Sequence, residues 1–410
     1  MAGRRKLAMF AGMATVGLLA AFSAAAQKPS MKDEVRIGVL TDMASAYSDL
    51  VGAGSVIAAR MAIEDFEAAE KPSFKIKLYS ADHQNKADVA SNIARRWFDQ
   101  DGVDMITDVT GASVALAVSK LAPVYDKVIL MTSSGQPSLT SEDCQKTVLH
   151  WTYNTFAVGR STAEIVTREG GSTWFFITAD YAGGRSMEEG ATAGVRAAGG
   201  KVLGSAKHPP AATTDFASQL LTAQSSGAKV VGLANAGADA INTIKQAREF
   251  GIQRQQTLAA ALLFITDVHS LGLPLAQGMY MTSAFYWDLN EASRTWSRRF
   301  FERHGKMPTM VQAGLYSATL HYLKAVKAAS TVDAQTVVRQ MRATPVRDMF
   351  TQSGYIRDDG LMVHDLYSFK VKAPADSKEP WDLLSLRATI PGDQAFAPLS
   401  ESKCAHVVAR

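Results

Sequence analysis

The feature that most constrains the fold of this chain is a repeated alternation of short β-rich runs and longer segments with helical spacing. A β-rich run comes first, and an amphipathic segment follows each of the first three runs. In order along the chain, these pieces occupy 35–41, 54–69, 74–81, 87–100, 103–109, 113–126 and 128–133. Such alternation is typical of a parallel sheet with helices on both faces. The sequence therefore predicts an α/β unit in this region.

The same alternation starts again after WTYNT at 151–155. The further β-rich runs occupy 173–178, 201–208, 230–236 and 257–264. Segments between them, such as 239–251, have helical spacing. Because 410 residues are enough for more than one core, we predict two α/β units. The helical segments at 295–305 and 312–329 do not extend the second unit, which leaves them free to return to the first.

The first 26 residues differ in kind from the rest. Arg4, Arg5 and Lys6 lead into an uncharged run that ends in small residues at Ala24 and Ala26. A charged start, an apolar middle and an Ala-x-Ala end form the pattern of a secretory signal peptide. We therefore expect cleavage after Ala26 and a periplasmic mature protein. An uncleaved membrane anchor is the alternative interpretation.

The net charge argues against a nucleic-acid-binding protein. The chain has 43 basic and 39 acidic residues, and removing the three basic residues near the N-terminus leaves 40 against 39. Proteins that bind nucleic acids need a concentration of basic side chains to displace counterions from the phosphates. A nearly neutral mature chain gives no such indication.

Cysteine usage indicates one cross-link and no metal site. Cys144 and Cys404 are the only cysteines, and in an oxidising compartment we expect them to form a disulfide. Two buried free thiols are the alternative. The sequence has no CxxC, HExxH or HxH motif, so we expect neither a metal nor a cofactor.

Catalytic motifs are absent or out of place. No G-x-S-x-G nucleophile elbow occurs, and an S-x-x-K at 226–229 falls between a helix and a strand. A glycine-rich helix start at Gly52 and Gly54 has Ile57 where a dinucleotide site needs its third glycine. The sequence therefore favours a protein that is not an enzyme.

Small and hydroxyl-bearing residues follow the predicted strands. The loops concerned are DMASAY at 42–47, TGAS at 110–113, TSSG at 132–135, ADYAGG at 179–184 and NAGAD at 235–239. In open α/β sheets, ligands bind outside the carboxyl ends of the strands, where backbone N–H groups and hydroxyls can face an anion. For each loop taken alone, simple helix capping is the alternative. Together, the five loops predict a ligand cleft between two lobes.

These segments carry a resemblance that extends over essentially the whole mature chain. One family has similar segments in the same order. In this chain the segments are RIGVLTDMASAYSDLVGAGSVIAARMAIEDF, MTSSGQPSLTSEDC, TADYAGG and PTMVQAGLYSATLHYLKAV. The chain resembles a type I periplasmic solute-binding protein of the branched-chain amino acid class, the extracytoplasmic receptor of an ABC importer. The resemblance implies two Rossmann-like lobes joined by three crossovers. It also implies a monomer that captures a small carboxylate and delivers it to a membrane permease.

The resemblance further implies how the chain divides. Residues 27–154 and about 286–345 are expected to form the first lobe, and residues 155–285 and about 346–395 the second. The C-terminal tail, 396–410, is expected to return to the first lobe.

Most residues that the resemblance assigns to the ligand site lie in the loops at the strand ends. First-lobe hydroxyls and N–H groups would hold the ligand carboxylate, aromatic residues would close over it from both lobes, and one aromatic lies near a crossover. The predicted set is Tyr47, Thr110, Gly111, Ala112, Ser113, Ser133, Ser134, Tyr181, Asn235, Ala236, Gly237, Leu263 and Phe285. For the aromatic residues, packing in a lobe core is the alternative.

One departure from the family bears on the ligand. Where amino acid binders of this class have a second-lobe glutamate against the ligand's ammonium, this chain reads AALLFITD. Leu262 or Leu263 is the nearest match, and Asp267 follows a few residues later. Because burying an unpaired ammonium costs several kcal/mol, either Asp267 substitutes or the ligand has no ammonium. We favour an aromatic acid over a branched-chain amino acid.

Two other functions stay open at this stage. A ligand sensor of the same fold, coupled to a regulatory or chemotaxis partner, would have the same sequence features. An exported enzyme would need a reactive serine, for which Ser133 is the candidate.

Overall fold

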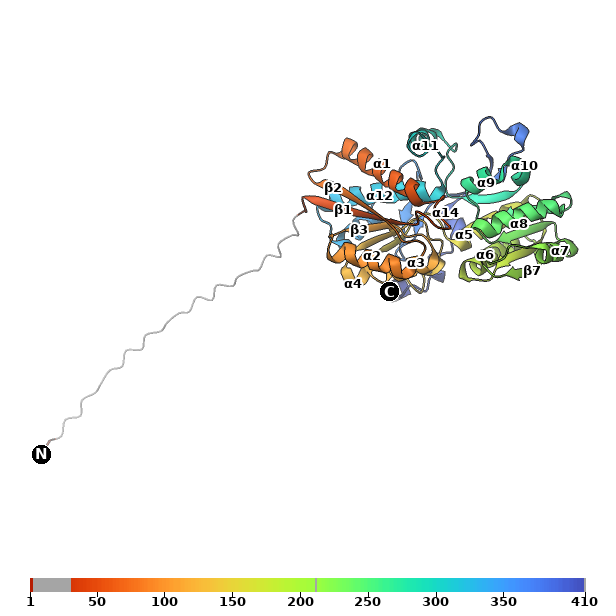
Figure 1. Cartoon of the computed structure of the whole chain (residues 1–410). Coiled ribbons are helices and arrows are strands. Elements are labelled where there is room, and N and C mark those ends of the chain that lie inside the picture. Colours follow the sequence, from red (N-terminus) through yellow and green to blue (C-terminus); the bar gives the residue numbers. More distant parts are fainter. Residues whose placement is uncertain (3–30, 211, 409–410) are drawn as a thin grey trace.

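Two α/β lobes lie side by side in the computed structural model (Figure 1). The structure describes residues 1–2, 31–210 and 212–408. The predicted signal peptide and its cleavage site therefore lie almost entirely outside the described residues. We define each lobe by its sheet, and the two sheets confirm the predicted α/β class.

The first lobe is built on a five-stranded sheet in the order β2-β1-β3-β4-β5, and all its neighbouring strands are parallel. Its strands are β1 (Glu34–Thr41), β2 (Lys75–Asp82), β3 (Met105–Asp108), β4 (Val128–Met131) and β5 (Val148–His150). The helices between them are α1 (Gly52–Glu70), α2 (Ala87–Asp99), α3 (Ala112–Ser119) and α4 (Ala122–Tyr125), with a short 3-10 turn, η1 (Pro137–Thr140).

The second lobe is built on a seven-stranded sheet in the order β14-β13-β10-β9-β8-β6-β7, in which only β13 pairs antiparallel with its neighbours. Its strands are β6 (Thr173–Ala179), β7 (Lys201–His208), β8 (Val230–Ala234), β9 (Thr257–Ala260), β10 (Tyr280–Ser283), β13 (Leu366–Val371) and β14 (Leu384–Ile390). The helices of this part are α5 (Thr155–Arg168), α6 (Ala182–Ala197), α7 (Ala217–Ser225), α8 (Gly237–Glu249), η2 (Ile252–Arg254), α9 (Ile265–Leu271) and α10 (Leu273–Ala276).

Helices cover both faces of each sheet because successive strand residues point to opposite sides. In β4, Val128 and Leu130 join the core shared with α1, whereas Ile129 and Met131 join the core shared with α2 and α3. In β6, Phe175 belongs to one second-lobe core and Phe176 to the other. Continuous apolar runs such as VILM are expected for strands buried on both faces.

The register brings the carboxyl ends of the first-lobe strands into one row. Leu40 of β1 lies beside Asp108 of β3, Asp108 beside Met131 of β4, and Met131 beside His150 of β5. The loops that follow these strands are therefore neighbours, although they are far apart in the sequence. This row forms the first-lobe edge of the cleft.

The last third of the chain crosses back to the first lobe and out again. The elements concerned are α11 (Glu291–His304), α12 (Met310–Ala329), α13 (Ala334–Ala343), β11 (Tyr355–Ile356) and β12 (Met362–Val363). Helix α12 packs on α1, and Leu361 forms a parallel bridge with His150. The segment 346–364 thus contacts the first lobe, whereas the sequence assigned it to the second, whose sheet resumes only at Leu366. Strands β11 and β12 pair only with each other, so their sequence does not indicate to which lobe they belong.

The tail returns to the first lobe through a disulfide. It contains the turns α14 (Gly392–Ala395), η4 (Leu399–Glu401) and α15 (Ala405–Val408), after a surface turn η3 (Pro374–Asp376). Cys404 is bonded to Cys144, and Ser402 donates a hydrogen bond to the carbonyl of Thr140 at 2.8 Å. The predicted cross-link is therefore present.

One predicted helix is divided in the structure. The segment at 113–126 forms α3 and α4 instead of a single helix. Pro123 lies at the start of α4, where its missing N–H is tolerated; inside a continuous helix it would remove a hydrogen bond and clash with the preceding turn.

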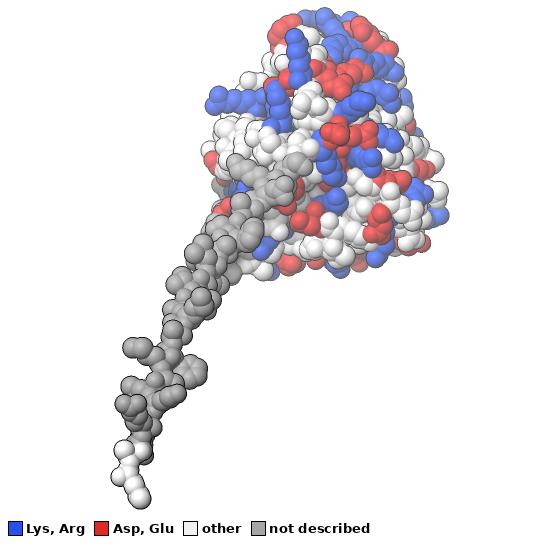
Figure 2. Space-filling view, turned by 90° about the vertical axis from the view of Figure 1, so that its left-hand side faces the viewer, with Lys and Arg blue, Asp and Glu red and all other residues white. Residues whose placement is uncertain are grey.

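Charges of both signs are interspersed on the face seen in Figure 2, with no single-sign surface across it. Ion pairs such as Asp65 with Arg299 and Glu70 with Lys327 join α1 to α11 and α12. Of the helices in the described part of the chain, none has the length and apolar character needed to cross a membrane.

Candidate functional site

A small cavity lies between the lobes, at the carboxyl ends of the parallel strands. The volume of the cavity is about 80 Å³. A single water molecule needs roughly 10–15 Å³ of such volume. The space therefore suits a compact molecule and not a peptide or an oligosaccharide. The cavity is lined by Tyr47, Leu50, Thr110, Gly111, Ala112, Ser133, Ser134, Gly135, Gln136, Tyr153, Thr155, Tyr181, Gly183, Ala236, Gly237, Leu262 and Phe264.

Asp42 holds the loop that presents Tyr47. Its carboxylate accepts hydrogen bonds from the Ser45 hydroxyl at 2.6 Å, the Ser45 N–H at 2.9 Å and the Tyr47 N–H at 3.1 Å. Burial alone would raise the pKa of Asp42, but these hydrogen bonds outweigh burial and hold the pKa below its ordinary value. The charged carboxylate thus fixes Tyr47 at the cavity wall.

A strained turn after β3 supplies Thr110 and Gly111. Asp108 and Val109 both have positive φ, +80° and +59°, which costs about 1–3 kcal/mol for each non-glycine residue. Gly111 has φ +90°, and a Cβ there would lie 2.5 Å from the Asn85 side-chain oxygen. Thr110 Oγ1 lies 2.9 Å from Ser133 Oγ. Two buried hydroxyls from adjacent strand ends therefore meet at one wall of the cavity.

The loop after β4 is held by a buried histidine and by the first crossover. His150 Nε2 lies 2.6 Å from the carbonyl of Ser134, and burial lowers the pKa of His150 to about 4. The imidazole is therefore neutral at pH 7, and Nε2–H donates to that carbonyl. Thr155 donates to the carbonyl of Gly135 through its N–H at 2.9 Å and its hydroxyl at 3.1 Å. Both contacts fix the serine cluster relative to α5.

Three tyrosines from different parts of the chain surround the cavity. Burial raises the pKa of Tyr181 to about 12 and that of Tyr47 and Tyr153 above the ordinary value. All three are neutral phenols at physiological pH. The Tyr153 ring stands edge-on to Phe264, with ring centroids 6.3 Å apart. Aromatic surface from both lobes thus encloses the space.

Three helices begin at the cavity without a side-chain cap. Helix α3 starts after Gly111, α6 after Tyr181 and α8 after Ala236, and none of these N-cap side chains accepts a hydrogen bond from its helix. The first backbone N–H groups of a helix have no partner within it, and the helix dipole is positive at this end. Three such helix ends around one cavity favour a bound anion.

The second-lobe segment after β9 places alternate residues on opposite sides. Leu262 and Phe264 line the cavity, whereas Leu263, which the sequence assigned to the ligand, packs in the second-lobe core. Of the two residues that the sequence offered as the nearest match, Leu262 therefore faces the cavity and Leu263 faces the core. Asp267 accepts a hydrogen bond from the Phe264 N–H at 2.9 Å at the start of α9, and burial raises its pKa to about 6. It does not line the cavity.

Three other predicted residues lie outside the cavity lining. Ser113 is exposed on α3. Asn235 is buried and donates to Thr243 Oγ1 at 3.1 Å. Phe285 packs in the core at a crossover, beside Trp296. The other predicted residues, Tyr47, Thr110, Gly111, Ala112, Ser133, Ser134, Tyr181, Ala236 and Gly237, come together around the cavity.

Sequence reasoning missed the contribution of the first crossover. Tyr153 and Thr155 line the cavity and belong to WTYNT, which the sequence pattern marks only as the boundary between the two α/β units. Phe264 and Gly183 were also missed. Gly183 is needed because a Cβ there would lie 2.7 Å from the Tyr181 ring. The aromatic residue inside a polar stretch was the available signal at Tyr153.

The chain matches the periplasmic binding protein family over residues 34–378. A periplasmic binding protein from Burkholderia mallei is 45% identical with a TM-score of 0.85, and the alignment covers 91% of this chain and 99% of that chain. A branched-chain amino acid ABC transporter periplasmic ligand-binding protein from Burkholderia xenovorans is 40% identical with a TM-score of 0.86, covering 91% and 100%.

A more distant similarity concerns the fold alone. A solute-binding protein of an ABC transporter from Rhodopseudomonas palustris, solved with 3,4-dihydroxybenzoic acid, is 17% identical with a TM-score of 0.78, covering 88% of this chain and 98% of that chain. No curated protein matches the chain. The family match and the two Burkholderia proteins lead to one conclusion: this chain belongs to the periplasmic binding proteins of ABC transporters, in the type I branched-chain amino acid class, whose members bind substrates and are not enzymes.

Proposed function

We propose that this protein captures a small carboxylate without an α-ammonium group, an aromatic acid in preference to a branched-chain amino acid, and delivers it to an ABC permease. One observation carries the proposal. Three uncapped helix N-termini and the Thr110–Ser133 hydroxyl pair surround a cavity with no acidic side chain among its described lining residues. This environment favours a carboxylate and gives an ammonium no partner.

The rest of the lining supports a flat apolar body for the ligand. Tyr47, Tyr153, Tyr181 and Phe264 provide aromatic surface, and Leu262, one of the two nearest matches to the glutamate of amino acid binders of this class, adds an apolar side chain to the lining. Aromatic rings pack well against such surfaces in offset or edge-on geometry. Phenol groups on the wall can also donate hydrogen bonds to a ring substituent.

The solved relatives are compatible with either acid class. The 40%-identical Burkholderia xenovorans protein is described as part of a branched-chain amino acid transporter. Distant proteins from Rhodopseudomonas palustris were solved with 3,4-dihydroxybenzoic acid and with 4-hydroxybenzoate. A carboxylate is common to both classes, so the choice depends on how the ammonium would be treated in this cavity.

Closure of the lobes would couple capture to delivery. In this structure the lobes meet around the cavity, and a single buried cluster contains Leu130 of the first lobe and Leu262 of the second. A ligand that touches both walls stabilises this closed arrangement over an open one. The permease would then recognise the closed form. No bond is made or broken.

A comparison of three ligands tests the proposal. Calorimetry and thermal-shift measurements would use 4-hydroxybenzoate, leucine and the neutral 4-hydroxybenzamide with the mature protein. We expect 4-hydroxybenzoate to bind most tightly and to add about 2.7 kcal/mol of stability at 100 times its Kd. The amide controls for ring packing without a carboxylate. Tighter binding of leucine, or equal binding of acid and amide, would contradict the proposal.

We further propose that the mature protein starts after Ala26 and acts as a monomer. The Ala-x-Ala pattern supports the cleavage site. Mass spectrometry of the exported protein checks the first residue, and light scattering of the purified protein checks the mass in solution. A retained leader or a dimer would contradict the respective part.

A further inference from the structure

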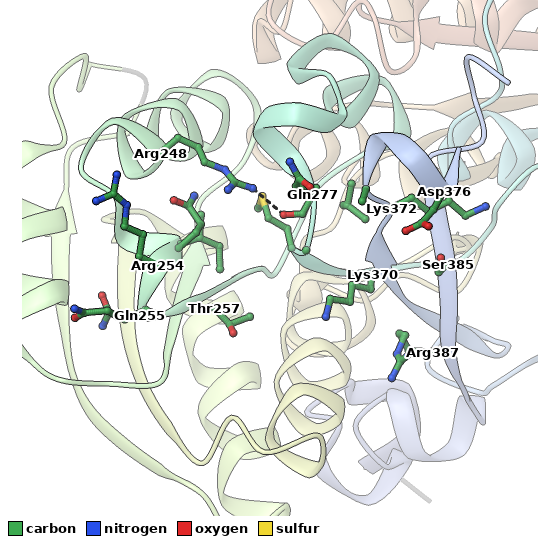
Figure 3. Close-up of a pocket in the computed structure, with 17 residues that line it drawn as sticks. Arg248, Arg254, Gln255, Thr257, Gln277, Lys370, Lys372, Asp376, Ser385 and Arg387 are labelled. Carbon is green, nitrogen blue, oxygen red and sulfur yellow. Dashed lines mark hydrogen bonds between the residues drawn. The ribbon is translucent and has the colours of Figure 1, made fainter. Parts of the chain in front are cut away.

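A second and larger groove lies at the opposite end of the second lobe from the cavity (Figure 3). It is formed where β9 and β10 begin, together with the end of β13 and the start of β14. The volume of the groove is about 690 Å³, compared with about 80 Å³ for the cavity. The cavity residues Leu262 and Phe264 follow the far end of β9, so the two sites are separated by the length of the strand.

The groove is strongly cationic. Its lining includes the basic side chains Arg248 and Arg254, which lie on one side in Figure 3, and Lys370, Lys372 and Arg387, which lie on the other. Asp376 is the one acidic residue of the described lining. A patch of this kind attracts anions through its summed field.

Only part of this charge is neutralised by neighbouring groups. Lys372 pairs with Asp382, and Arg387 pairs with Glu169 at 3.0 Å. In contrast, Arg248, Arg254 and Lys370 form no salt bridge among the described residues, although the charge of Lys370 interacts with the Glu169 carboxylate and helps to lower its pKa. Arg248 and Arg254 are therefore the groove cations without a carboxylate partner in the described part of the chain.

Two of the groove cations are held in place. Arg248 donates to the carbonyl of Leu275 at 2.7 Å and to that of Gln277 at 2.8 Å. Burial lowers the pKa of Arg248, as expected for a partly desolvated cation without a counter-charge. Lys370 Nζ lies over the Tyr280 ring, 5.1 Å from its centroid. The charges are thus positioned before any ligand arrives.

The groove also contains unpartnered polar atoms. Both side-chain polar atoms of Gln253 are buried without a hydrogen-bond partner, and so is Oε1 of Gln256. Leaving a buried donor unsatisfied costs about 1–3 kcal/mol. The Gln253 amide is buried at the groove wall, so its N–H would reach an anion only after the side chain turns towards the groove, whereas the Thr257 and Ser385 hydroxyls could donate directly.

We propose that this groove is a second binding site, for a small anion with several charged oxygens of the phosphate type. Guanidinium groups match the geometry of two phosphate oxygens, and a lysine and the hydroxyls add point donors. The polar wall does not suit the aromatic acid of the cleft, and one carboxylate would leave most of the cations unpaired. A free phosphate compound and an anionic lipid headgroup present the same chemistry here.

Inorganic pyrophosphate is the probe for a calorimetric test at 0.15 M salt. The variant is Arg254→Gln combined with Lys370→Gln, because neither side chain forms a hydrogen bond or a salt bridge among the described residues. The matched control is Arg298→Gln, since Arg298 is exposed on α11 of the first lobe. We expect saturable binding by the wild type, at least tenfold weaker binding by the double variant and no change in the control. Absence of binding by the wild type, or equal binding by all three proteins, overturns the proposal.

Hydrogen–deuterium exchange locates the site independently of the variants. Pyrophosphate is expected to protect the segments around 253–257 and 370–372, and protection confined to other regions overturns the proposal.

Flotation with phosphatidylglycerol vesicles then distinguishes a lipid headgroup from a free phosphate compound as the ligand. Vesicle binding that pyrophosphate competes away indicates a headgroup, and pyrophosphate binding without vesicle binding indicates a free anion. The affinity of the double variant for 4-hydroxybenzoate is measured in parallel. This measurement distinguishes a failure of ligand binding in the cleft from a failure of anion binding in the groove.

Discussion

The side-chain oxygens of Thr110 and Ser133 lie 2.9 Å apart, just after the carboxyl ends of β3 and β4, although the two residues are 23 positions apart in the sequence. Both hydroxyls are almost fully buried, with exposed fractions of 2% and 4%. A hydroxyl can donate only one hydrogen, so in this pair one oxygen donates to the other and the second hydrogen is available to an acceptor. Both residues line the cavity, and we expect a bound carboxylate to accept this second hydrogen.

Replacement of Ser133 by alanine removes one member of this pair. We expect Ser133→Ala to weaken binding of 4-hydroxybenzoate by roughly 1–3 kcal/mol, or about 5- to 150-fold, because a buried carboxylate oxygen loses a donor. The control is Ser113→Ala, since Ser113 is exposed and outside the cavity lining. Calorimetry checks both, and unchanged affinity in Ser133→Ala would show that the hydroxyl has a purely local role.

A carboxylate introduced at Leu262 is expected to reverse the ligand preference. Leu262→Glu places a negative charge at a wall that now has none, so affinity for 4-hydroxybenzoate should fall more than tenfold through charge repulsion. Affinity for leucine relative to 4-hydroxybenzoate should rise, because the ammonium gains a partner. Leu262→Gln has the same shape without the charge and is the control. If both variants lose the aromatic acid equally, size and not charge is responsible.

Gly111 is expected to be sensitive in both stability and affinity. Alanine there must adopt φ +90°, which costs about 1–3 kcal/mol, and its Cβ would displace the Asn85 side chain from a distance of 2.5 Å. Gly170→Ala is the matched control, because Gly170 has φ +107° with nothing within 4 Å. Urea unfolding should show both variants destabilised, and titration should show weaker ligand binding only in Gly111→Ala. Equal affinities in the two variants would remove Gly111 from the site.

His150 is expected to make the protein less stable in mild acid. Its pKa is lowered to about 4 by burial, so the unfolded chain binds a proton near pH 6.5 while the folded protein does not. The stabilising effect of the neutral imidazole is complete above pH 6.5 and is lost as the pH falls towards 4. Its upper limit is about 3 kcal/mol.

Asp267, whose pKa is raised to about 6, contributes with the opposite sign over an overlapping range. The contribution of His150 is therefore measured as the difference between the wild type and His150→Asn in urea unfolding at pH 7.5, 6 and 4.5. The advantage of the wild type should shrink as the pH falls. A constant difference across this range would mean that His150 does not titrate on unfolding.

Local sequence patterns were sufficient for most strands of the two sheets and for naming many of the loops that line the cavity. The alternation of β-rich and helical runs predicted β1 to β4 and β6 to β9. Central strands such as β4 and β8 are apolar because they are buried on both faces, whereas the edge strands β2 and β7 alternate between apolar and polar residues. The loops with Tyr47, Thr110, Ser133 and Tyr181 could be named because, in parallel sheets, loops after strands share one edge. These predictions depend only on the chain's own periodicity and on the rules of α/β topology.

Tertiary structure decided what depends on contacts between distant segments. Whether Leu262 or Leu263 faces the cavity follows from how the chain leaves β9, and a shift of one residue exchanges the two faces. Tyr153 lines the cleft because the first crossover brings its ring against Phe264 of the second lobe. The segment 346–364 contacts the first lobe and the first crossover through Leu361 beside His150 and through His364 at the carbonyl of Thr152, which no local pattern records. The sequence by itself thus determined the lobes and the polar edge of the cleft, whereas packing between the lobes determined which side chains close it.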